Sequence, residues 1–251
     1  MAKFVPDVKT QRWIVISTNR SHRPNDVLAV SSSVKTGLDP FAQGNEHLTP
    51  PEVFRTGTGQ ANEPGWRVRV VPNKFPITDI HEVIIHSPDA VKDIQDFDLD
   101  QINDLFFAYR QRYQTHRDDG HVLIFNNHGE LAGASLSHPH SQVVVIPRQI
   151  NLDVLVREPV NNVVEDNKLF TVYCPDFSQW PYEVWIAPKV ENTYFGDTSD
   201  EMLKELSIVA KSTICRLRGC YDNPETKKVR AELPFAYNYY IFHRHYAYLL
   251  F

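Results

Sequence analysis

The chain has 251 residues, of which 42% are hydrophobic and 23% are charged, and its formal net charge is −5. This length is enough to bury a sizeable core as one large domain or two fused halves, and the near-average composition excludes disordered and fibrous proteins. The slightly acidic charge gives no basic footprint for nucleic-acid binding, and no apolar run approaches the roughly 20 residues of a membrane span.

The cysteines and the N-terminal residues indicate in which cellular compartment the protein is expected. Cys174, Cys215 and Cys220 form no Cys-x-x-Cys pair, so we expect neither a disulfide framework nor a cysteine zinc site. The first residues lack a secretory pattern. We therefore expect a cytoplasmic protein that binds neither nucleic acid nor membranes.

Two segments in the first third of the chain offer groups that bind phosphate. A strand is predicted at Trp13–Ile16, and Arg20 and Arg23 follow it, so that two guanidiniums three residues apart can fork onto phosphate oxygens. Asn73 and Lys74 lie between two prolines and offer an amide and an ammonium group. Taken alone, each segment also fits an ordinary surface turn or connection.

A strand–helix–strand pattern recurs in the two halves of the chain. The first set is predicted at residues 81–86, 99–115 and 121–126, and the second at residues 182–187, 198–210 and 239–242. Asp98 is expected to cap the first helix, and the capping-box spacing of Thr198 and Glu201 opens the second. Glu82 and Glu183, each followed by valine, lie 101 residues apart (183 − 82) and the helix starts keep this offset, which favours a duplication over chance recurrence.

The duplication predicts two domains, residues 1–150 and residues 151–251. A polar, proline-containing insertion around residues 223–234 displaces the last strand of the second half. The counterpart of residues 138–142 would then fall beyond residue 251, so we expect the second half to lack its final strand. The sheet edge left exposed would invite pairing with another chain, as in a homodimer.

The segment from Gly133 to Gln142 carries the strongest chemical signal. A small-residue turn leads into a predicted strand on which His138, His140 and Gln142 alternate onto one side. A neutral imidazole at His140 is suited to attack on phosphorus, and Gln142 would donate to a phosphoryl oxygen without adding charge. The same spacing also suits two ligands of one metal ion. It is equally compatible with two ordinary histidines that are hydrogen-bonded within a packed sheet.

The chain resembles the galactose-1-phosphate uridylyltransferase family, a branch of the histidine-triad superfamily, over nearly its whole length. The resemblance rests on five motifs in the family's order. They are Trp13–Ile16 with Arg20-Ser21-His22-Arg23-Pro24, then Asp39-Pro40-Phe41-Ala42-Gln43-Gly44-Asn45-Glu46, then residues 69–76, Phe125-Asn126-Asn127-His128-Gly129, and residues 133–142.

The resemblance implies an α+β fold of two fused half-barrels of antiparallel strands flanked by helices, commonly dimeric. It implies that His140 attacks the α-phosphorus of a UDP-hexose (UDP-glucose or UDP-galactose), releases the hexose 1-phosphate, and leaves a uridylyl-histidine that a second hexose 1-phosphate discharges. Gln142 would steady the phosphoryl oxygens, and His138 would orient the loop. The implied nucleotide and phosphate contacts are Arg20, Arg23, Asn73, Lys74, Asn127, Gly133 and Ser135.

Other activities remain open within the same resemblance. An ADP-sugar or other sugar-nucleotide phosphorylase or adenylyltransferase would use the same residues, and Lys74, where some family members carry an acidic residue, favours a different nucleotide or phosphate acceptor. An impaired nucleotide-binding relative is a third reading, because the second half is expected to be short. A hydrolase fits less well, because Gln142 stands where hydrolytic relatives have a histidine.

The metal site of zinc-containing family members is expected to be absent. The corresponding positions here are Asp39, Ala42, Ala90 and His138. Two alanines cannot ligate, and the remaining two residues fall short of the four ligands of a structural zinc. We therefore expect no zinc at this site and no other cofactor; an improvised site of His47, His81 and His86 is the alternative.

Overall fold

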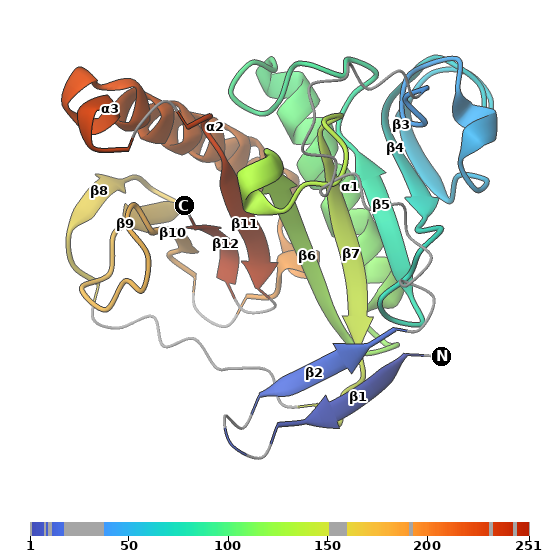
Figure 1. Cartoon of the computed structure of the whole chain (residues 1–251), viewed down its shortest axis with the longest axis horizontal. Helices are drawn as coiled ribbons and strands as arrows, with labels where there is room; N and C mark the ends of the chain where they lie inside the picture. The colour runs from blue at the N-terminus through green and yellow to red at the C-terminus, as the bar shows by residue number, and fades with distance from the viewer. Residues whose placement is uncertain are drawn as a thin grey trace.

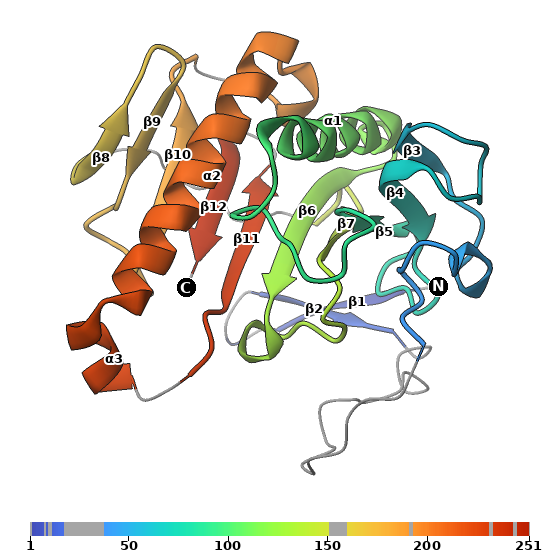
Figure 2. The same ribbon diagram turned by 90° about the horizontal axis from the view of Figure 1, so that it is seen from above.

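The protein is built around one antiparallel sheet of ten strands with its two long helices packed on the same face (Figures 1 and 2). The structure is a computed structural model, and it describes residues 2–7, 9, 12–17, 38–150, 160–190, 193–230, 233–242 and 245–250. The sheet order is β3-β4-β5-β7-β6-β11-β12-β10-β9-β8, and a separate two-stranded ribbon, β1-β2, lies at one end of the first half.

The elements have the following bounds. The strands are β1 Lys3–Pro6, β2 Trp13–Ile16, β3 Phe54–Gly57, β4 Trp66–Pro72, β5 His81–Ile85, β6 His121–His128, β7 His140–Ile146, β8 Val163–Asp166, β9 Phe170–Tyr173, β10 Val184–Pro188, β11 Tyr237–Phe242 and β12 His245–Leu250. The α-helices are α1 Leu99–His116, α2 Asp200–Asp222 and α3 Pro224–Arg230, and short 3-10 helices occur at Glu46–Leu48, Glu130–Ala132 and Phe195–Asp197.

The strand order supports the predicted duplication. Reading outward from the central β6–β11 pair, the first half runs β6, β7, β5, β4, β3 and the second runs β11, β12, β10, β9, β8. Each half places one long helix between its third-last and second-last strands in the chain, and α1 packs against α2 over the sheet. The α+β fold of the histidine-triad type is confirmed, and the division at residue 150 stays a prediction.

The expectation that the second half lacks its last strand is wrong. β12 pairs antiparallel with both β11 and β10, which is the position that β7 holds between β6 and β5. The expectation failed because it assumed a connection as long as that of the first half, whereas β12 begins at His245, shortly after β11 ends at Phe242. The exposed edge is therefore absent at this point, and a homodimer remains an expectation from the family resemblance alone.

Both long helices lie where the sequence predicts them, with one difference in capping. The Asp98 carboxylate accepts a hydrogen bond from the Gln101 amide at 2.7 Å and caps α1 as predicted. The cap of α2 is Ser199, whose hydroxyl accepts from Met202, and not Thr198. Thr198 instead turns its hydroxyl back to the Phe195 carbonyl, which closes the preceding 3-10 turn.

The helix-side core joins the two halves. Apolar residues at helical spacing on α1 and α2 pack against the side chains of β4–β7 and β9–β11 that face them. Gly196 lies against the Tyr113 ring so closely that a Cβ atom would come within 2.6 Å of it. Arg110 of α1 donates to the Thr198 carbonyl and the Asp200 carboxylate, which ties α1 to the start of α2.

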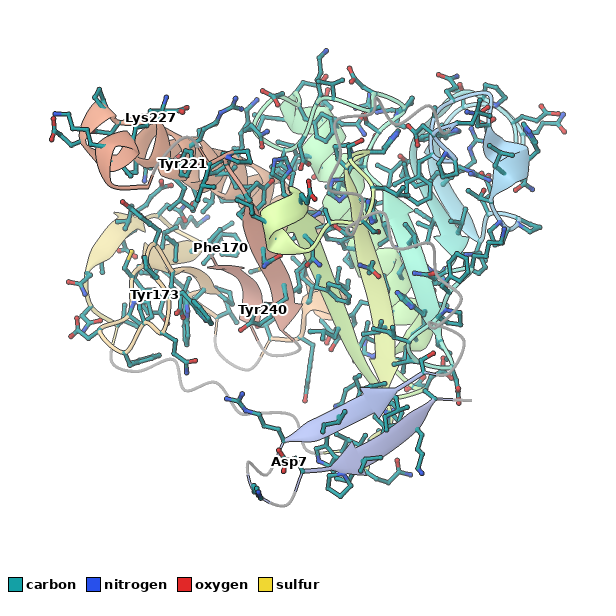
Figure 3. All side chains as sticks on the ribbon, in the orientation of Figure 1. Asp7, Phe170, Tyr173, Tyr221, Lys227 and Tyr240 are labelled. Carbon is teal, nitrogen blue, oxygen red and sulfur yellow. The ribbon has the colours of Figure 1, made fainter. Side chains whose placement is uncertain are left out.

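The opposite face of the sheet is covered in parts. In the second half, Tyr173 packs with Trp185 on this face, while Phe170 of the same strand points into the helix-side core (Figure 3). In the first half, residues 38–50 cross the strands and bury Phe41 against Trp66, Val71 and Ile85. Part of this face remains open as pockets. In the described part of the chain, no helix has the length and apolar character to cross a membrane.

A buried ion pair fastens β5 to α1. Arg112 donates to both carboxylate oxygens of Glu82, at 2.8 and 2.6 Å, and His116 lies 2.9 Å from the same carboxylate. Burial alone would raise the pKa of Glu82, but the hydrogen bonds from His116 and Arg112 outweigh it and hold the pKa below its usual range.

We expect Arg112→Ala to lower the free energy of unfolding by about 3–5 kcal/mol, because it leaves the Glu82 carboxylate buried without its bidentate partner. The matched control is Arg117→Ala, directly after the end of the same helix, whose partner Asp197 is about half exposed. An exposed pair of this kind contributes about 0–1 kcal/mol. Urea denaturation followed by circular dichroism measures both, and equal losses in the two variants would contradict this assignment.

Candidate active site

Strand β7 turns alternate side chains to the two faces of the sheet. His140 and Gln142 face the open side, and Ser141 between them is fully buried on the helix side. The pair lies on one face as predicted. His138 precedes β7, which begins at His140, and its ring lies edge-on to Phe41, which also packs against His140, so its place beside the pair stays a prediction.

Two adjoining pockets meet at His140 and Gln142. The larger has a volume of about 330 Å³ and lies between residues 38–50 and the open face of β4, β5 and β7. The smaller has a volume of about 150 Å³ and lies under the β6–β7 loop. The apolar wall of the larger pocket, which sequence reasoning did not identify, consists of Phe41, Leu48, Val71, Phe75 and Leu136.

The structure brings most of the predicted contact residues to these pockets. Asn73, Lys74 and Ser135 line the larger one, and Asn127, Gly133 and Ser135 line the smaller. Gly133 has φ = +87°, a left-handed conformation that favours glycine, and it sets the turn that brings Ser135 over the strand. Arg20 and Arg23 lie outside the described residues.

The position of the proton on His140 follows from its hydrogen bond. Nδ1 lies 2.8 Å from the carbonyl oxygen of His138. A carbonyl only accepts, so Nδ1 carries the hydrogen and the lone pair of the neutral ring is on Nε2. The edge of the Phe41 ring packs against this imidazole. His140 is therefore held as the tautomer that a nucleophile at Nε2 requires.

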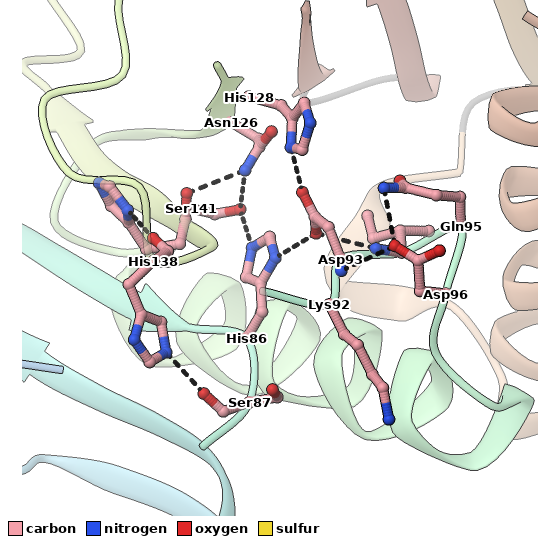
Figure 4. Close-up of polar contacts among 12 residues, drawn as sticks. His86, Ser87, Lys92, Asp93, Gln95, Asp96, Asn126, His128, His138 and Ser141 are labelled. Atoms are coloured by element: carbon pink, nitrogen blue, oxygen red, sulfur yellow. Dashed lines mark hydrogen bonds and ion pairs between the residues drawn. The ribbon is translucent and has the colours of Figure 1, made fainter. Parts of the chain in front are cut away.

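Behind β7, a buried polar network holds the strand in place (Figure 4). Asn126 donates to the His140 carbonyl at 2.8 Å, and Ser141 contacts His86 Nε2 at 2.7 Å. His86 Nδ1 lies 3.1 Å from Asp93, whose other oxygen accepts from His128 at 2.6 Å. Burial alone would raise the pKa of Asp93, but these two histidines outweigh it and hold the pKa far below its usual range.

In this network a serine, a histidine and an aspartate are linked one after another by hydrogen bonds, but they do not form a hydrolytic triad. Ser141, His86 and Asp93 are at most 1% exposed, and the Ser141 hydroxyl also contacts Tyr109. No substrate reaches a serine in that position. The arrangement is structural, and the two pockets lie on the other side of β7, which carries His140.

His138 is buried in a charge-assisted contact. Its Nδ1 lies 2.7 Å from the Asp39 carboxylate and its Nε2 lies 2.8 Å from the Ser87 carbonyl. Both partners only accept, so the ring satisfies both as the doubly protonated imidazolium. Burial alone would raise the pKa of Asp39, but the hydrogen bonds from His138 and from the Phe41 amide outweigh it and lower the pKa. The pair anchors residues 38–41 to the start of β7.

Comparison with known proteins gives independent evidence about the relatives of this chain. Residues 78–146, which include β5, α1, β6 and β7, match the family described as galactose-1-phosphate uridyl transferase, N-terminal domain. The matched segment includes the strand that carries His140 and Gln142.

Curated relatives of the family differ in activity. A galactose-1-phosphate uridylyltransferase from Thermotoga maritima is 22% identical over 237 residues, covering 85% of this chain and 74% of the relative. An ADP-glucose phosphorylase from Arabidopsis thaliana is 26% identical over an alignment of 264 residues, covering 87% of this chain and 74% of the relative. Relatives at this level of identity thus include both a nucleotidyltransferase and a phosphorylase.

Solved structures show the same fold. The crystal structure of the Arabidopsis thaliana ADP-glucose phosphorylase with bound ADP-glucose superposes with a TM-score of 0.70 at 22% identity, covering all of this chain and 89% of that one. A uridylyltransferase structure gives a TM-score of 0.69 at 21% identity, covering 99% of this chain and 85% of that one.

The residues at the family's zinc positions do not fit a zinc ion. Asp39 and His138 bind each other directly, and both nitrogens of His138 already have partners. Ala42 and Ala90 have no ligating atom. Among the described residues, no group of three or more histidine, cysteine, aspartate or glutamate side chains is arranged to hold a metal.

We expect Asp39→Asn to lower the free energy of unfolding at pH 7 by about 1–2 kcal/mol, since a charge-assisted hydrogen bond is lost at a partly exposed carboxylate. Because the pKa of Asp39 is lower in the folded state, its contribution is present above the unfolded-state pKa and is lost as the pH falls through the folded-state pKa. The difference between the two proteins should therefore shrink below about pH 4. Urea titrations at several pH values measure it, and a pH-independent difference would contradict the ion pair.

We also expect the purified protein to contain far less than one zinc per chain when its metal content is measured by inductively coupled plasma mass spectrometry. The matched control restores the ligands with Asp39→Cys, Ala42→Cys and Ala90→His, which together with His138 provide the four that a structural zinc needs. That variant should hold about one zinc per chain. Stoichiometric zinc in the unmodified protein would overturn the expectation.

Proposed function

We propose that the protein transfers a nucleotidyl group from a sugar nucleotide to a phosphate acceptor through a nucleotidyl-His140 intermediate. The observation that carries the proposal is the bond from His140 Nδ1 to the His138 carbonyl, which leaves the lone pair on Nε2 of a ring that borders both pockets. The match of residues 78–146 to the uridyl transferase family supports the same class of reaction.

The proposed transfer divides into two displacements. Nε2 attacks the α-phosphorus, a P–N bond forms, and the bond from that phosphorus to the bridging oxygen breaks, releasing the hexose 1-phosphate with the electron pair. A phosphate oxygen of the acceptor then attacks, a P–O bond forms, and the P–N electrons return to Nε2. In the intermediate the ring is cationic, so the hydrogen bond from Nδ1 to the His138 carbonyl strengthens and stabilises it.

The pocket residues suit the parts of such a substrate. The apolar wall with Phe41 and Phe75 fits a nucleoside, and Asn73 and Lys74 lie at its edge. Gln142, Asn127 and Ser135 surround the smaller pocket and provide neutral donors for phosphoryl oxygens. Neutral donors stabilise the charge that develops on these oxygens without holding the anionic product as strongly as a cation would.

Two donor–acceptor pairs fit this proposal. The first is UDP-glucose or UDP-galactose with a hexose 1-phosphate, as in the galactose pathway, and the Thermotoga maritima uridylyltransferase supports it. The second is an ADP-sugar with inorganic phosphate, supported by the Arabidopsis thaliana ADP-glucose phosphorylase and by the cation of Lys74 at the pocket. An impaired nucleotide-binding relative is the outcome if neither pair reacts.

Intact-mass spectrometry tests the intermediate. The protein is incubated with UDP-glucose, UDP-galactose or ADP-glucose in the absence of an acceptor. We expect a mass gain of one UMP or one AMP group, which identifies the base, and no gain in His140→Ala. The matched control is His121→Ala at the opposite end of the neighbouring strand β6, which should keep the adduct.

Galactose 1-phosphate and inorganic phosphate are then added to separate samples that carry the adduct. The compound that removes the adduct is the acceptor. The absence of an adduct with all three sugar nucleotides would reject nucleotidyl transfer and leave nucleotide binding as the function. An adduct that survives in His140→Ala would reject His140 as the nucleophile.

A further inference from the structure

We infer that His81 is a positioning residue that orients the side-chain amide of Gln142, so that the NH2 group and not the carbonyl group faces the phosphoryl site. The inference rests on the proposed function, because it assigns how Gln142 becomes a donor for that reaction. In the sequence His81 is the first residue of a predicted strand, and no local spacing relates it to Gln142.

The register of the sheet brings the two residues together. Val83 of β5 lies opposite Gln142 of β7, and Ile85 lies opposite His140. His81 is two residues from Val83 on the same face, so it is the diagonal neighbour of Gln142. His81 is only 5% exposed, and it lines the larger pocket together with Gln142 and His140.

A backbone group determines which nitrogen of His81 carries the proton. The amide N–H of Ile77 donates to His81 Nδ1 at 3.0 Å. Nδ1 must therefore hold a lone pair, and the hydrogen of the neutral ring is on Nε2. His81 Nε2 lies 2.9 Å from Gln142 Oε1, so Nε2–H donates to the amide carbonyl.

A second neighbour of Nε2 does not change this assignment. The Asn73 amide nitrogen lies 3.1 Å away, but the Asn73 carbonyl oxygen accepts from the Phe75 amide at 2.8 Å and fixes that side chain. The Asn73 nitrogen is thus a donor beside a donor, and this contact is not a hydrogen bond. Gln142 Oε1 is the acceptor for His81.

The hydrogen bond from His81 determines which end of the Gln142 amide faces the phosphoryl site. With Oε1 held by His81, the NH2 group is the end of the amide that remains to contact a phosphoryl oxygen. Phosphoryl oxygens only accept, so the reversed amide would place two acceptors against each other and repel the substrate. His81 and His140 are thus opposite tautomers, one set by a backbone N–H and the other by a backbone carbonyl.

Nuclear magnetic resonance tests the arrangement without any activity. A long-range proton–nitrogen spectrum of the full chain labelled with 15N should show His81 as the Nε2–H tautomer. Its ring signals should move in Gln142→Leu, because the acceptor is lost, and should move less in the control Leu123→Ala. A His81 ring protonated on Nδ1, or one unaffected by Gln142→Leu, would overturn the inference whether or not the protein transfers nucleotides.

A double-mutant cycle on the rate of adduct formation tests the consequence. His81→Phe keeps a flat ring but no donor, and we expect it to slow adduct formation by about 10–100-fold, less than the ~10²–10³-fold expected for Gln142→Leu. In the Gln142→Leu background, His81→Phe should change the rate by less than about twofold, because His81 acts through Gln142. His81→Gln, which restores an amide donor, should recover part of the rate.

A purely structural role for His81 predicts a different pattern. The same fold-loss would then appear in both backgrounds, and nucleotide affinity measured by calorimetry would fall along with the rate. That result in a wild-type protein that forms the adduct would overturn the inference while leaving the proposed function intact. A wild-type protein without an adduct would instead reject the function, and the magnetic-resonance result would still decide the orientation of Gln142.

Discussion

The register of β7 between β5 and β6 is the constraint on which the site depends. Side chains of a strand alternate with a period of two, so a slip by one residue would turn Ser141 into the pocket and bury His140. The buried face opposes such a slip, because the Ser141 hydroxyl contacts His86 and Tyr109 and the Asn126 amide donates to the His140 carbonyl. The polar network behind the sheet thereby fixes the geometry in front of it.

Asp93 shows how that network tolerates a buried charge. The carboxylate is 1% exposed and accepts hydrogen bonds from His86, His128, the Ile94 amide and Tyr237. A buried charge without such partners would cost several kcal/mol or would be neutralised. Because the partners come from β6, β11 and the segment after β5, the same carboxylate also joins the two halves of the sheet at their central pair.

The two halves share a topology but not a chemistry. In the first half, residues 129–139 connect β6 to β7 and supply Gly133 and Ser135 to the smaller pocket. In the second half, β11 ends at Phe242 and β12 begins at His245, so the corresponding connection is far shorter than residues 129–139. The candidate site therefore belongs to the first half, and in the second half Tyr173, Trp185 and their neighbours pack on the corresponding face.

Local signals in the sequence were enough to predict much of this protein. The period of apolar residues and the Asp98 cap predicted α1, and the alternation after Pro139 predicted β7 with His140 and Gln142 on one face. These features depend on neighbours a few residues away, and for that reason they can be read without a fold. The ordered motifs predicted the family, and with it Asn73, Asn127, Gly133 and Ser135 as residues of the same pockets.

Only the tertiary structure decided which distant side chains act on these residues. The contact of Asp39 with His138 joins residues 99 positions apart, and that of His81 with Gln142 joins residues 61 apart, so no local pattern predicts them. The position of β12 was likewise decided by pairing with β10 and β11 and not by the length of the preceding loop. Hydrogen bonds across a sheet fix tautomers and amide orientations, and these are properties of register, which the sequence alone does not display.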